Sequence, residues 1–303
     1  MTWHKKGKAN LTKLRLLRTF VQFIMFLLMN LSFFLIGATW LVLPVVMPKS
    51  IFTTSEGAFD LLQRMLTTAI IPLIPLASFF LIGAVFGRMF CSWGCPFGLF
   101  QDIIGFLTSR FNKYEPTKDT NDSYRQIGEF IVGGSVLVSV VIGIGIGLGD
   151  AEQVKASFGV FSEQPWTALS PATFLFTVIP LLFYWGTIDT FFSWETFVQI
   201  DIFFWIRFLI FAGGLILIIY VPRGWCRWFC PVGIIMGQLG KNSMIGVGRN
   251  ISKCTHCGIC EDVCPMGVRI LSHPPEKVRS EHCTNCLDCV AACPEDAMEI
   301  KFL

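Results

Sequence analysis

Charged side chains are scarce in this sequence. Only 15% of the 303 residues are Asp, Glu, Lys or Arg, whereas 53% are hydrophobic. Soluble domains average about 25% charged residues, so this composition excludes an ordinary soluble enzyme. Residues 19–48, 65–87, 130–149 and 164–188 contain no charged side chain at all. Each stretch could cross a bilayer, because a spanning helix needs about 20 apolar residues.

Histidine is also rare, with four in the chain and none in an apolar stretch. Haem between membrane helices is usually held by histidine, and the C-x-x-C-H sequence for covalent haem does not occur. We therefore expect no haem. The glycines of residues 143–149 lie in an apolar helix and not in a strand–turn–helix unit, so we expect close helix packing there and no nucleotide. Nothing in the sequence indicates a nucleic-acid partner.

Lys and Arg near span ends decide orientation, because basic residues resist translocation. Residues 1–18 hold six bases and no acid, and residues 223–253 hold five bases and no acid. Residues 149–200 hold one base and five acids. The sequence therefore predicts a multi-pass protein of the cytoplasmic (inner) membrane with both termini in the cytoplasm.

An even number of spans follows from that orientation. We expect an α-helical integral membrane protein with four transmembrane helices, at 19–44, 67–89, 127–149 and 201–222. The remaining apolar stretch, 164–188, contains three prolines. Proline breaks helices, so this stretch is expected to be re-entrant or to lie along the outer face.

A short motif occurs twice, as CSWGCPFG at residues 91–98 and as CRWFCPVG at residues 226–233. Both cysteines, the tryptophan, the proline and the glycine match, which indicates two pseudo-repeats in the membrane. The expected organisation is a basic cytoplasmic N-terminus, a first repeat, a cytoplasmic loop, a second repeat, a linker and a C-terminal domain, at 1–18, 19–98, 99–126, 127–233, 234–252 and 253–303.

Eight of the twelve cysteines form two C-x2-C-x2-C-x3-C-P runs, at residues 254–265 and 283–294. This spacing is typical of an α+β two-cluster bacterial ferredoxin-like domain, in which the fourth cysteine of each run ligates the cluster of the other run. One 4Fe-4S cluster is expected on Cys254, Cys257, Cys260 and Cys293. The second is expected on Cys264, Cys283, Cys286 and Cys289. Zinc, which needs only four ligands in paired units, is disfavoured. His256, His273 and His282 lie off the pattern and are expected on the solvated surface.

The other four cysteines, Cys91, Cys95, Cys226 and Cys230, belong to the duplicated motif. They are expected to hold a third 4Fe-4S cluster where the two repeats meet. A redox-active thiol pair, a docking role or simple packing are the alternatives, since free cysteine behaves as a small buried hydrophobe.

One basic residue, Arg207, lies inside the fourth predicted span, and Glu195 and Asp201 precede it on the outer side. Ionisable side chains are costly inside a membrane, so those that occur there usually have a function. These three residues are therefore candidates for a quinol site, in which a carboxylate accepts the proton that quinol releases on oxidation. The alternative is that Arg207 pairs with an acid or reaches the interface.

Four spans, the doubled C-x3-C-P motif and the two tail runs together resemble the NapH-type membrane ferredoxins, whose relatives include MauN, the membrane portion of NosR, and CcoG. The resemblance implies a quinol dehydrogenase component that passes electrons between membrane quinol or quinone and a partner oxidoreductase. The partners that it implies are membrane lipid and other oxidoreductase subunits, among them a second ferredoxin-type subunit or a c-type cytochrome. The CcoG resemblance also allows an assembly or maturation factor for another respiratory enzyme, and an anchor for a soluble ferredoxin is a third possibility.

Overall fold

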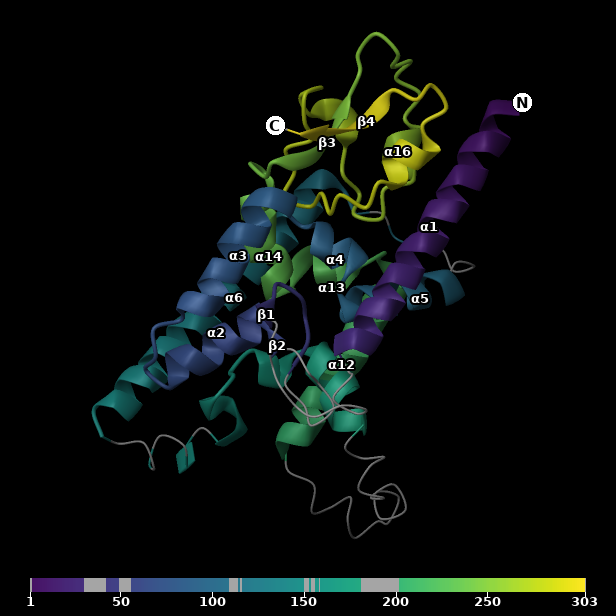
Figure 1. Ribbon diagram of the computed structural model, residues 1–303. Helices are drawn as coiled ribbons and strands as arrows, with labels where there is room; N and C mark the ends of the chain where they lie inside the picture. Colours follow the sequence, from purple (N-terminus) through teal and green to yellow (C-terminus); the bar gives the residue numbers. More distant parts are fainter. Residues whose placement is uncertain are drawn as a thin grey trace.

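The computed structural model describes residues 2–29, 42–48, 56–108, 114, 116–149, 153, 156–157, 159–180 and 202–302, and all structural statements below concern these residues. Most of them are helical (Figure 1). The first part contains α1 (Thr2–Met29), β1 (Val42–Leu43), β2 (Glu56–Gly57), α2 (Ala58–Thr67), α3 (Leu73–Phe86), α4 (Met89–Trp93), α5 (Pro96–Leu107) and α6 (Lys118–Gly147). The second part contains η2 (Gly159–Ser162), η3 (Thr167–Leu169), α8 (Pro171–Thr173), η4 (Phe174–Val178), α12 (Ile202–Tyr220), α13 (Gly224–Trp228) and α14 (Pro231–Gly240).

The C-terminal unit lies at one end of the helical part, beside the N-terminal half of α1 (Figure 1). It contains β3 (Ile245–Arg249), α15 (Ile259–Asp262), η5 (Ile270–Ser272), α16 (Asp288–Ala292) and β4 (Met298–Phe302). The two strands are antiparallel, with Ile245 opposite Phe302. Most of the linker predicted at 234–252 is occupied by α14 and β3, and its role as the connection between two domains stays a prediction. A Gly-containing strand whose partner lies about 50 residues away gives no local signal.

The two repeats share one arrangement of helices. In each, a long apolar helix is followed by a five-residue helix that carries the first cysteine, and the second cysteine caps the next helix: α3, α4 and α5 in one repeat, and α12, α13 and α14 in the other. The motif's proline occupies the first turn of α5 and α14, where a missing N–H costs nothing. Helix occupies both ends of the cytoplasmic loop predicted at 99–126, since α5 continues to Leu107 and α6 begins at Lys118. The cytoplasmic position of this segment stays a prediction.

Three predicted spans can be compared with described helices. The third lies in α6, whose segment Asp119–Gly147 is the one helix within the described residues that is both long and apolar enough to cross a membrane. The fourth corresponds to α12. The second, at 67–89, is wrong as a continuous helix, because α2 ends at Thr67 and α3 begins only after Pro72. For the first, α1 reaches Met29, and residues 30–41 lie outside the described part.

The stretch predicted as re-entrant is irregular over its described part, residues 164–180. It consists of short 3₁₀, α and π turns, and Thr167, Ala172 and Phe174 are buried against the helices around them. Its contacts are mainly with α12. This irregular backbone is therefore covered by protein, as membrane depth requires.

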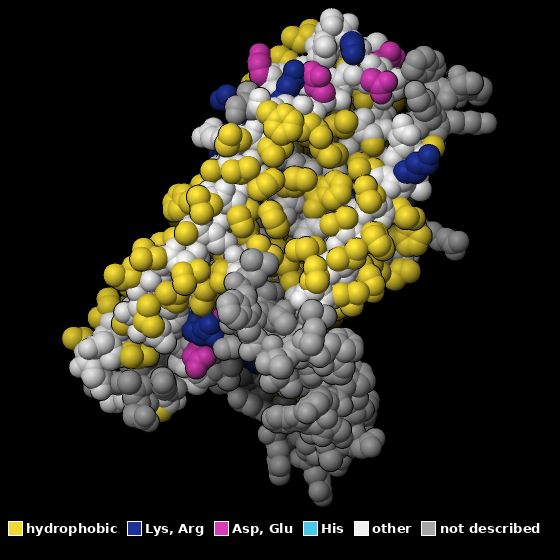
Figure 2. Space-filling model, in the orientation of Figure 1, with side chains coloured by type: hydrophobic (Ala, Val, Ile, Leu, Met, Phe, Trp, Pro, Cys, Tyr) yellow, Lys and Arg dark blue, Asp and Glu magenta, His cyan; other side chains and the backbone are white. Residues whose placement is uncertain are grey.

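Large apolar side chains cover much of the outer surface of the helical part. Phe80, Leu81 and Phe130 are 60%, 70% and 83% exposed. Figure 2 shows this hydrophobic face between charged groups at its two ends. An apolar surface of this extent is typical of a protein that contacts lipid or another protein.

Close packing of α6 depends on glycine, as the sequence predicted for the stretch that includes Gly143. A Cβ added at Gly143 would lie 2.0 Å from the carbonyl oxygen of Leu66 in α2. Near the other end of α6, a Cβ at Gly128 would lie 1.9 Å from the carbonyl oxygen of Trp228 in α13. Both contacts are with backbone, so neither can be relieved by a side-chain rotation.

Replacing Gly143 by alanine is therefore expected to lower the free energy of unfolding by about 3 kcal/mol, the upper range for overpacking. Gly133→Ala is the matched control, because a Cβ at Gly133 on the same helix meets nothing within 4 Å. Its expected effect is neutral or a stabilisation of up to about 1 kcal/mol. Thermal unfolding of both proteins in detergent, followed by circular dichroism, measures the difference. Equal midpoints would contradict this account of the α2–α6 contact.

Candidate cysteine sites

The tail cysteines form two groups, each around a small cavity. Cys264, Cys283, Cys286 and Cys289 line one of these cavities, and we call this group the proximal tail site. Cys254, Cys257, Cys260 and Cys293 line the other, and we call this group the distal tail site. Each group combines three cysteines of one run with the fourth of the other. The structure thus brings together the two sets of four that the spacing predicted.

Both runs bend around their cavities by the same backbone turns. Six residues adopt positive φ, at the same three positions of each run: His256, Gly258 and Gly267 in the first, and Asn285, Leu287 and Asp296 in the second. The turns direct backbone N–H groups towards sulfur. Val268 donates to Cys264 Sγ at 3.4 Å, and Ala297 donates to Cys293 Sγ at 3.3 Å. Such hydrogen bonds stabilise thiolate ligands and tune a cluster's potential.

The chemistry of the thiols fits a metal cluster. Burial raises the pKa of Cys283 and the pKa of Cys286 to about 11 each, so the free thiols would be neutral at pH 7. Coordination to metal deprotonates such groups. Within the described residues, no three His, Cys, Asp or Glu side chains converge on a single ion. Two groups of four thiols at this spacing are the ligand set that two 4Fe-4S clusters need.

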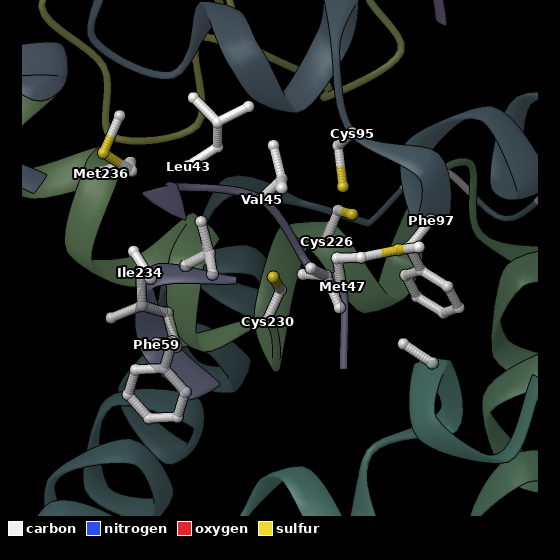
Figure 3. Close-up of a cluster of buried hydrophobic side chains, with 14 of the residues drawn as sticks. Leu43, Val45, Met47, Phe59, Cys95, Phe97, Cys226, Cys230, Ile234 and Met236 are labelled. Carbon is white, nitrogen blue, oxygen red and sulfur yellow. The ribbon is translucent and has the colours of Figure 1, made fainter. Parts of the chain in front are cut away.

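The remaining cysteines, which we call the membrane cysteine site, come together from the two repeats. Cys91, Cys95, Cys226 and Cys230 are 6%, 3%, 7% and 2% exposed. Figure 3 shows three of their side chains in the apolar core beside Met47 and Phe97. Each sulfur interacts electrostatically with at least one sulfur of the other repeat. Four thiols from two motifs therefore share one buried place.

Each motif needs its glycine because the carbonyl oxygen of the motif's first cysteine leaves no room for a side chain at that position. A Cβ at Gly98 would lie 2.7 Å from the oxygen of Cys91, and a Cβ at Gly233 would lie 2.9 Å from the oxygen of Cys226. The backbone N–H of Gly233 donates to Cys230 Sγ at 3.4 Å. The repeated glycine thus lets the chain return closely enough to supply an N–H to sulfur.

An arginine from each repeat reaches the motif of the other. Arg88 Nη2 donates to the carbonyl of Cys226 at 2.8 Å. Arg223 Nη1 donates to Ser92 Oγ at 2.7 Å, and its Nε donates to Asp102 at 2.7 Å. The hydrogen bond from Cys230 lowers the pKa of Cys226 to about 7, and the positive charges of Arg223 and Arg88 contribute to this shift. Burial raises the pKa of Cys91 and of Cys95, and the hydrogen bond to Cys226 together with burial raises the pKa of Cys230. The two buried cations therefore favour thiolate at Cys226 alone among the four.

The membrane cysteine site and the proximal tail site are in direct contact. Ser92, which follows Cys91, is hydrogen-bonded to Thr284, which follows Cys283, with 2.9 Å between the two hydroxyl oxygens. Beside it, Trp93 Nε1 donates to the carbonyl of Asn285 at 3.2 Å. One short hydrogen-bonded bridge thus links a cysteine of each site.

A charged network that sequence reasoning missed fixes the tail to the helices. Arg18 Nη1 lies 2.7 Å from Asp288 in α16, and Arg18 Nη2 lies 3.8 Å from Asp102. Arg15 Nε also donates to Asp288, at 3.0 Å. Although burial opposes it, the pairing with Arg223 holds the pKa of Asp102 below its ordinary value. The only signal in the sequence was the basic N-terminus, which indicated orientation and not a binding partner.

Two predictions about polar residues have different outcomes. His282 is wrong as a surface residue, because it is only 9% exposed; burial first, then Arg88, Arg125 and Arg227, lower its pKa to about 3. It is therefore neutral at pH 7. In the proposed quinol group, Glu195 and Asp201 lie outside the described residues. Arg207 lies half-buried on α12.

Comparisons with protein families agree with this geometry. A family described as a 4Fe-4S dicluster domain matches residues 253–298, which include both tail sites. A second family, described as a 4Fe-4S binding domain, matches twice, at residues 68–113 and 203–252. These two segments are the two repeats of the duplicated motif and contain the membrane cysteine site.

Comparisons with curated proteins identify relatives. The chain is 26% identical to the ferredoxin-type protein NapH of Escherichia coli over 70% of its own length and 61% of NapH. It is 24% identical to the methylamine utilization ferredoxin-type protein MauN of Methylobacillus flagellatus, over 76% of its length and 64% of MauN. Identity to YccM of Escherichia coli is 25%, over 72% of this chain and 52% of YccM. The chain thus spans between half and two thirds of these relatives. No solved structure matches. The chain is therefore similar to the ferredoxin-type proteins NapH and MauN, and its tail matches a 4Fe-4S dicluster domain.

Proposed function

We propose that the protein holds three 4Fe-4S clusters and passes electrons between membrane quinol and a partner oxidoreductase. The observation that carries this proposal is the bridge between Ser92 and Thr284, since it joins the membrane cysteine site to the proximal tail site. Iron–sulfur clusters supply one-electron transfer when bound. Quinol releases two electrons with two protons, so clusters in contact would let the pair separate.

The assignment of ligands follows the three groups of cysteines. Cys254, Cys257, Cys260 and Cys293 would hold one cluster, Cys264, Cys283, Cys286 and Cys289 the second, and Cys91, Cys95, Cys226 and Cys230 the third. For the third, support comes from the buried cations Arg88 and Arg223, which offset negative charge on four thiolates. The double match to a 4Fe-4S binding domain also supports it.

The three sites would form a line from the membrane helices to the tail surface. Cys257 of the distal tail site is exposed, which would let a soluble or membrane-bound partner approach that cluster. A second ferredoxin-type subunit or a c-type cytochrome fits this role, because both exchange single electrons. NapH and MauN are named as ferredoxin-type proteins, which agrees with electron transfer rather than assembly of another enzyme.

The proposed placement is multi-pass in the cytoplasmic membrane, with both termini in the cytoplasm. Its support is that Arg15 and Arg18 near the N-terminus contact Asp288 in the tail, so the two ends share one side. The basic residues of the N-terminus favour the cytoplasmic side. Glu195, Asp201 and Arg207 remain a prediction for a quinol site towards the outer side.

Purified protein with its clusters, in liposomes, is expected to be reduced by added quinol. Cluster absorbance would fall and electron paramagnetic resonance signals would appear, because a reduced cube is paramagnetic. A buffer-only sample and a fully dithionite-reduced sample set the limits. No reduction by quinol, in protein that dithionite reduces, would contradict the quinol proposal. Copurification of a stoichiometric oxidoreductase would support electron transfer, whereas a transient partner would favour an assembly factor.

A further inference from the structure

An apolar groove opens on the outside of the helical part, between α2, α3, α6 and α14. Its lining is apolar apart from two residues, and includes Leu62, Leu76, Phe79, Phe80, Ile234 and Leu239, around a volume of about 370 Å³. Leu76 and Phe80 are also exposed at the surface, at 38% and 60%. A hydrophobic molecule dissolved in lipid could therefore enter from the side. The volume is within the range of small-molecule sites.

The two polar residues of the groove are Glu129 and Gln238, and they touch each other. Glu129 Oε1 accepts from Arg125 Nε at 3.0 Å and from Gln238 Nε2 at 3.2 Å. Both bonds go to the same oxygen, and the Glu129 side chain is 36% exposed. A carboxylate and an amide at the end of an apolar groove provide a proton acceptor and a hydrogen-bond donor for a polar head group.

Glu129 and Gln238 also line a second, polar cavity of about 410 Å³ that lies on the tail side. Arg125, Lys241 and His282 are among the residues that line it. Within the described residues, neither ring nitrogen of His282 has a hydrogen-bond partner. The carboxylate of Glu129 thus stands between an apolar groove and a polar cavity, which offers a released proton a way out.

The same polar residues connect the groove to the proximal tail site. Arg125 Nε, which binds Glu129, lies 2.5 Å from Glu281 Oε2. Glu281 is two residues before Cys283, and Arg88 Nη1 binds its carbonyl at 2.7 Å. The end of the groove is therefore tied by two ion pairs to the segment that supplies a cysteine of that site.

We infer that this groove binds quinol, with its head group at Glu129 and Gln238 and its tail towards lipid. This inference rests on the proposed function and names the site of its substrate. A lipid-soluble carrier that gives up electrons and protons together is the occupant that fits an apolar groove, a carboxylate and a nearby electron acceptor. An ordinary lipid acyl chain would not need the carboxylate.

Oxidation of one hydroquinone breaks two O–H bonds and releases two protons and two electrons. Glu129 accepts the first proton, passes it to the polar cavity and then accepts the second. Cys264, Cys283, Cys286 and Cys289 would hold the one-electron acceptor, so the two electrons would leave one at a time, and the partner oxidoreductase would reoxidise that acceptor.

Three variants in liposomes test the site. Glu129→Gln should keep quinone binding but slow cluster reduction by quinol at least about 100-fold, the contribution of a general base. Leu76→Trp should fill the groove and abolish binding. Leu81→Trp is the matched control, since Leu81 is on the same helix, is 70% exposed and lies outside the groove. It should behave as the unchanged protein.

Binding is measured separately from reduction, by photolabelling with an azidobenzoquinone and mapping of the labelled peptides. Labels on α3, α6 and α14 that Leu76→Trp removes would support the inference. Normal labelling and reduction in both Glu129→Gln and Leu76→Trp would overturn it, as would a loss of activity in Asp201→Asn alone. If quinol fails to reduce even the unchanged protein, the proposed function fails instead, and the photolabelling still decides whether the groove binds quinone.

Discussion

Replacing Cys226 by alanine is expected to lower the iron content from about twelve to about eight atoms per chain, with an equal loss of acid-labile sulfide. Cys226 is buried in the membrane cysteine site, where Gln101 Nε2 donates to its sulfur at 2.8 Å. A cube that loses one thiolate in an apolar core has no other ligand close by. The two tail sites lie in a separate unit and should keep their clusters.

Iron and sulfide assays on anaerobically purified protein measure this loss, and electron paramagnetic resonance shows which signal disappears. Val232→Ala is the matched control, because Val232 lies in the same core, is 2% exposed and offers no ligand. It should cost stability without changing iron. About eight irons in the unchanged protein would show that the four thiols are packing residues or a thiol pair, and the third cluster would be rejected.

Asp102→Asn is expected to destabilise the protein by about 3 to 5 kcal/mol, the cost of leaving a buried charge without its partner. Asp102 accepts two hydrogen bonds from Arg223, which is 3% exposed, and it lies near Arg18. Burial lowers the pKa of Arg223, and the Asp102 charge raises it above its ordinary value. The variant removes that charge, but a guanidinium stays protonated in proteins, so Arg223 would be left buried, charged and without its partner. Thermal unfolding in detergent gives the size of the effect.

The same pair predicts a dependence on pH. Because the pKa of Asp102 is lowered in the folded protein, its contribution is complete above the ordinary carboxyl value of about 4 and is lost as the pH falls through the folded value. The Asn variant should therefore lose less stability than the unchanged protein below pH 4. Glu299→Gln is a suitable control, because its carboxylate lies on the tail surface in an exposed pair with Lys301. Parallel pH profiles for all three proteins would argue against the Asp102 assignment.

The grouping of the tail cysteines could be predicted, because it depends on residues that are close together in the sequence. The positions of Cys254 to Cys293 in two identical runs determine which sulfurs can meet, and the turns at His256 and Asn285 follow from the same spacing. The strand β3 could not be predicted, because its partner β4 is distant in sequence and both strands are short.

The membrane part was predicted in outline and missed in detail. The repeat was visible in the matched motifs, but the contact of Arg223 with Asp102 joins residues 121 positions apart and depends on how the helices pack. His282 was misplaced because a polar side chain next to a cysteine run looks like a surface residue. The break before α3 was missed because the residues on both sides of it are apolar, so hydropathy does not show where one helix ends and the next begins. Pro72 was the local signal for it.

The exchange of arginines between the repeats has a consequence for biosynthesis. Because Arg88 binds the carbonyl of Cys226 and Arg223 binds Ser92, each half completes the surroundings of the other half's thiols. A ribosome that has delivered only the first half to the bilayer has made a chain with two unsupported thiols and an uncompensated guanidinium. If the four thiols hold the proposed third cluster, its loading would have to wait until the second half has emerged and docked, so maturation of the buried centre would follow translation rather than accompany it.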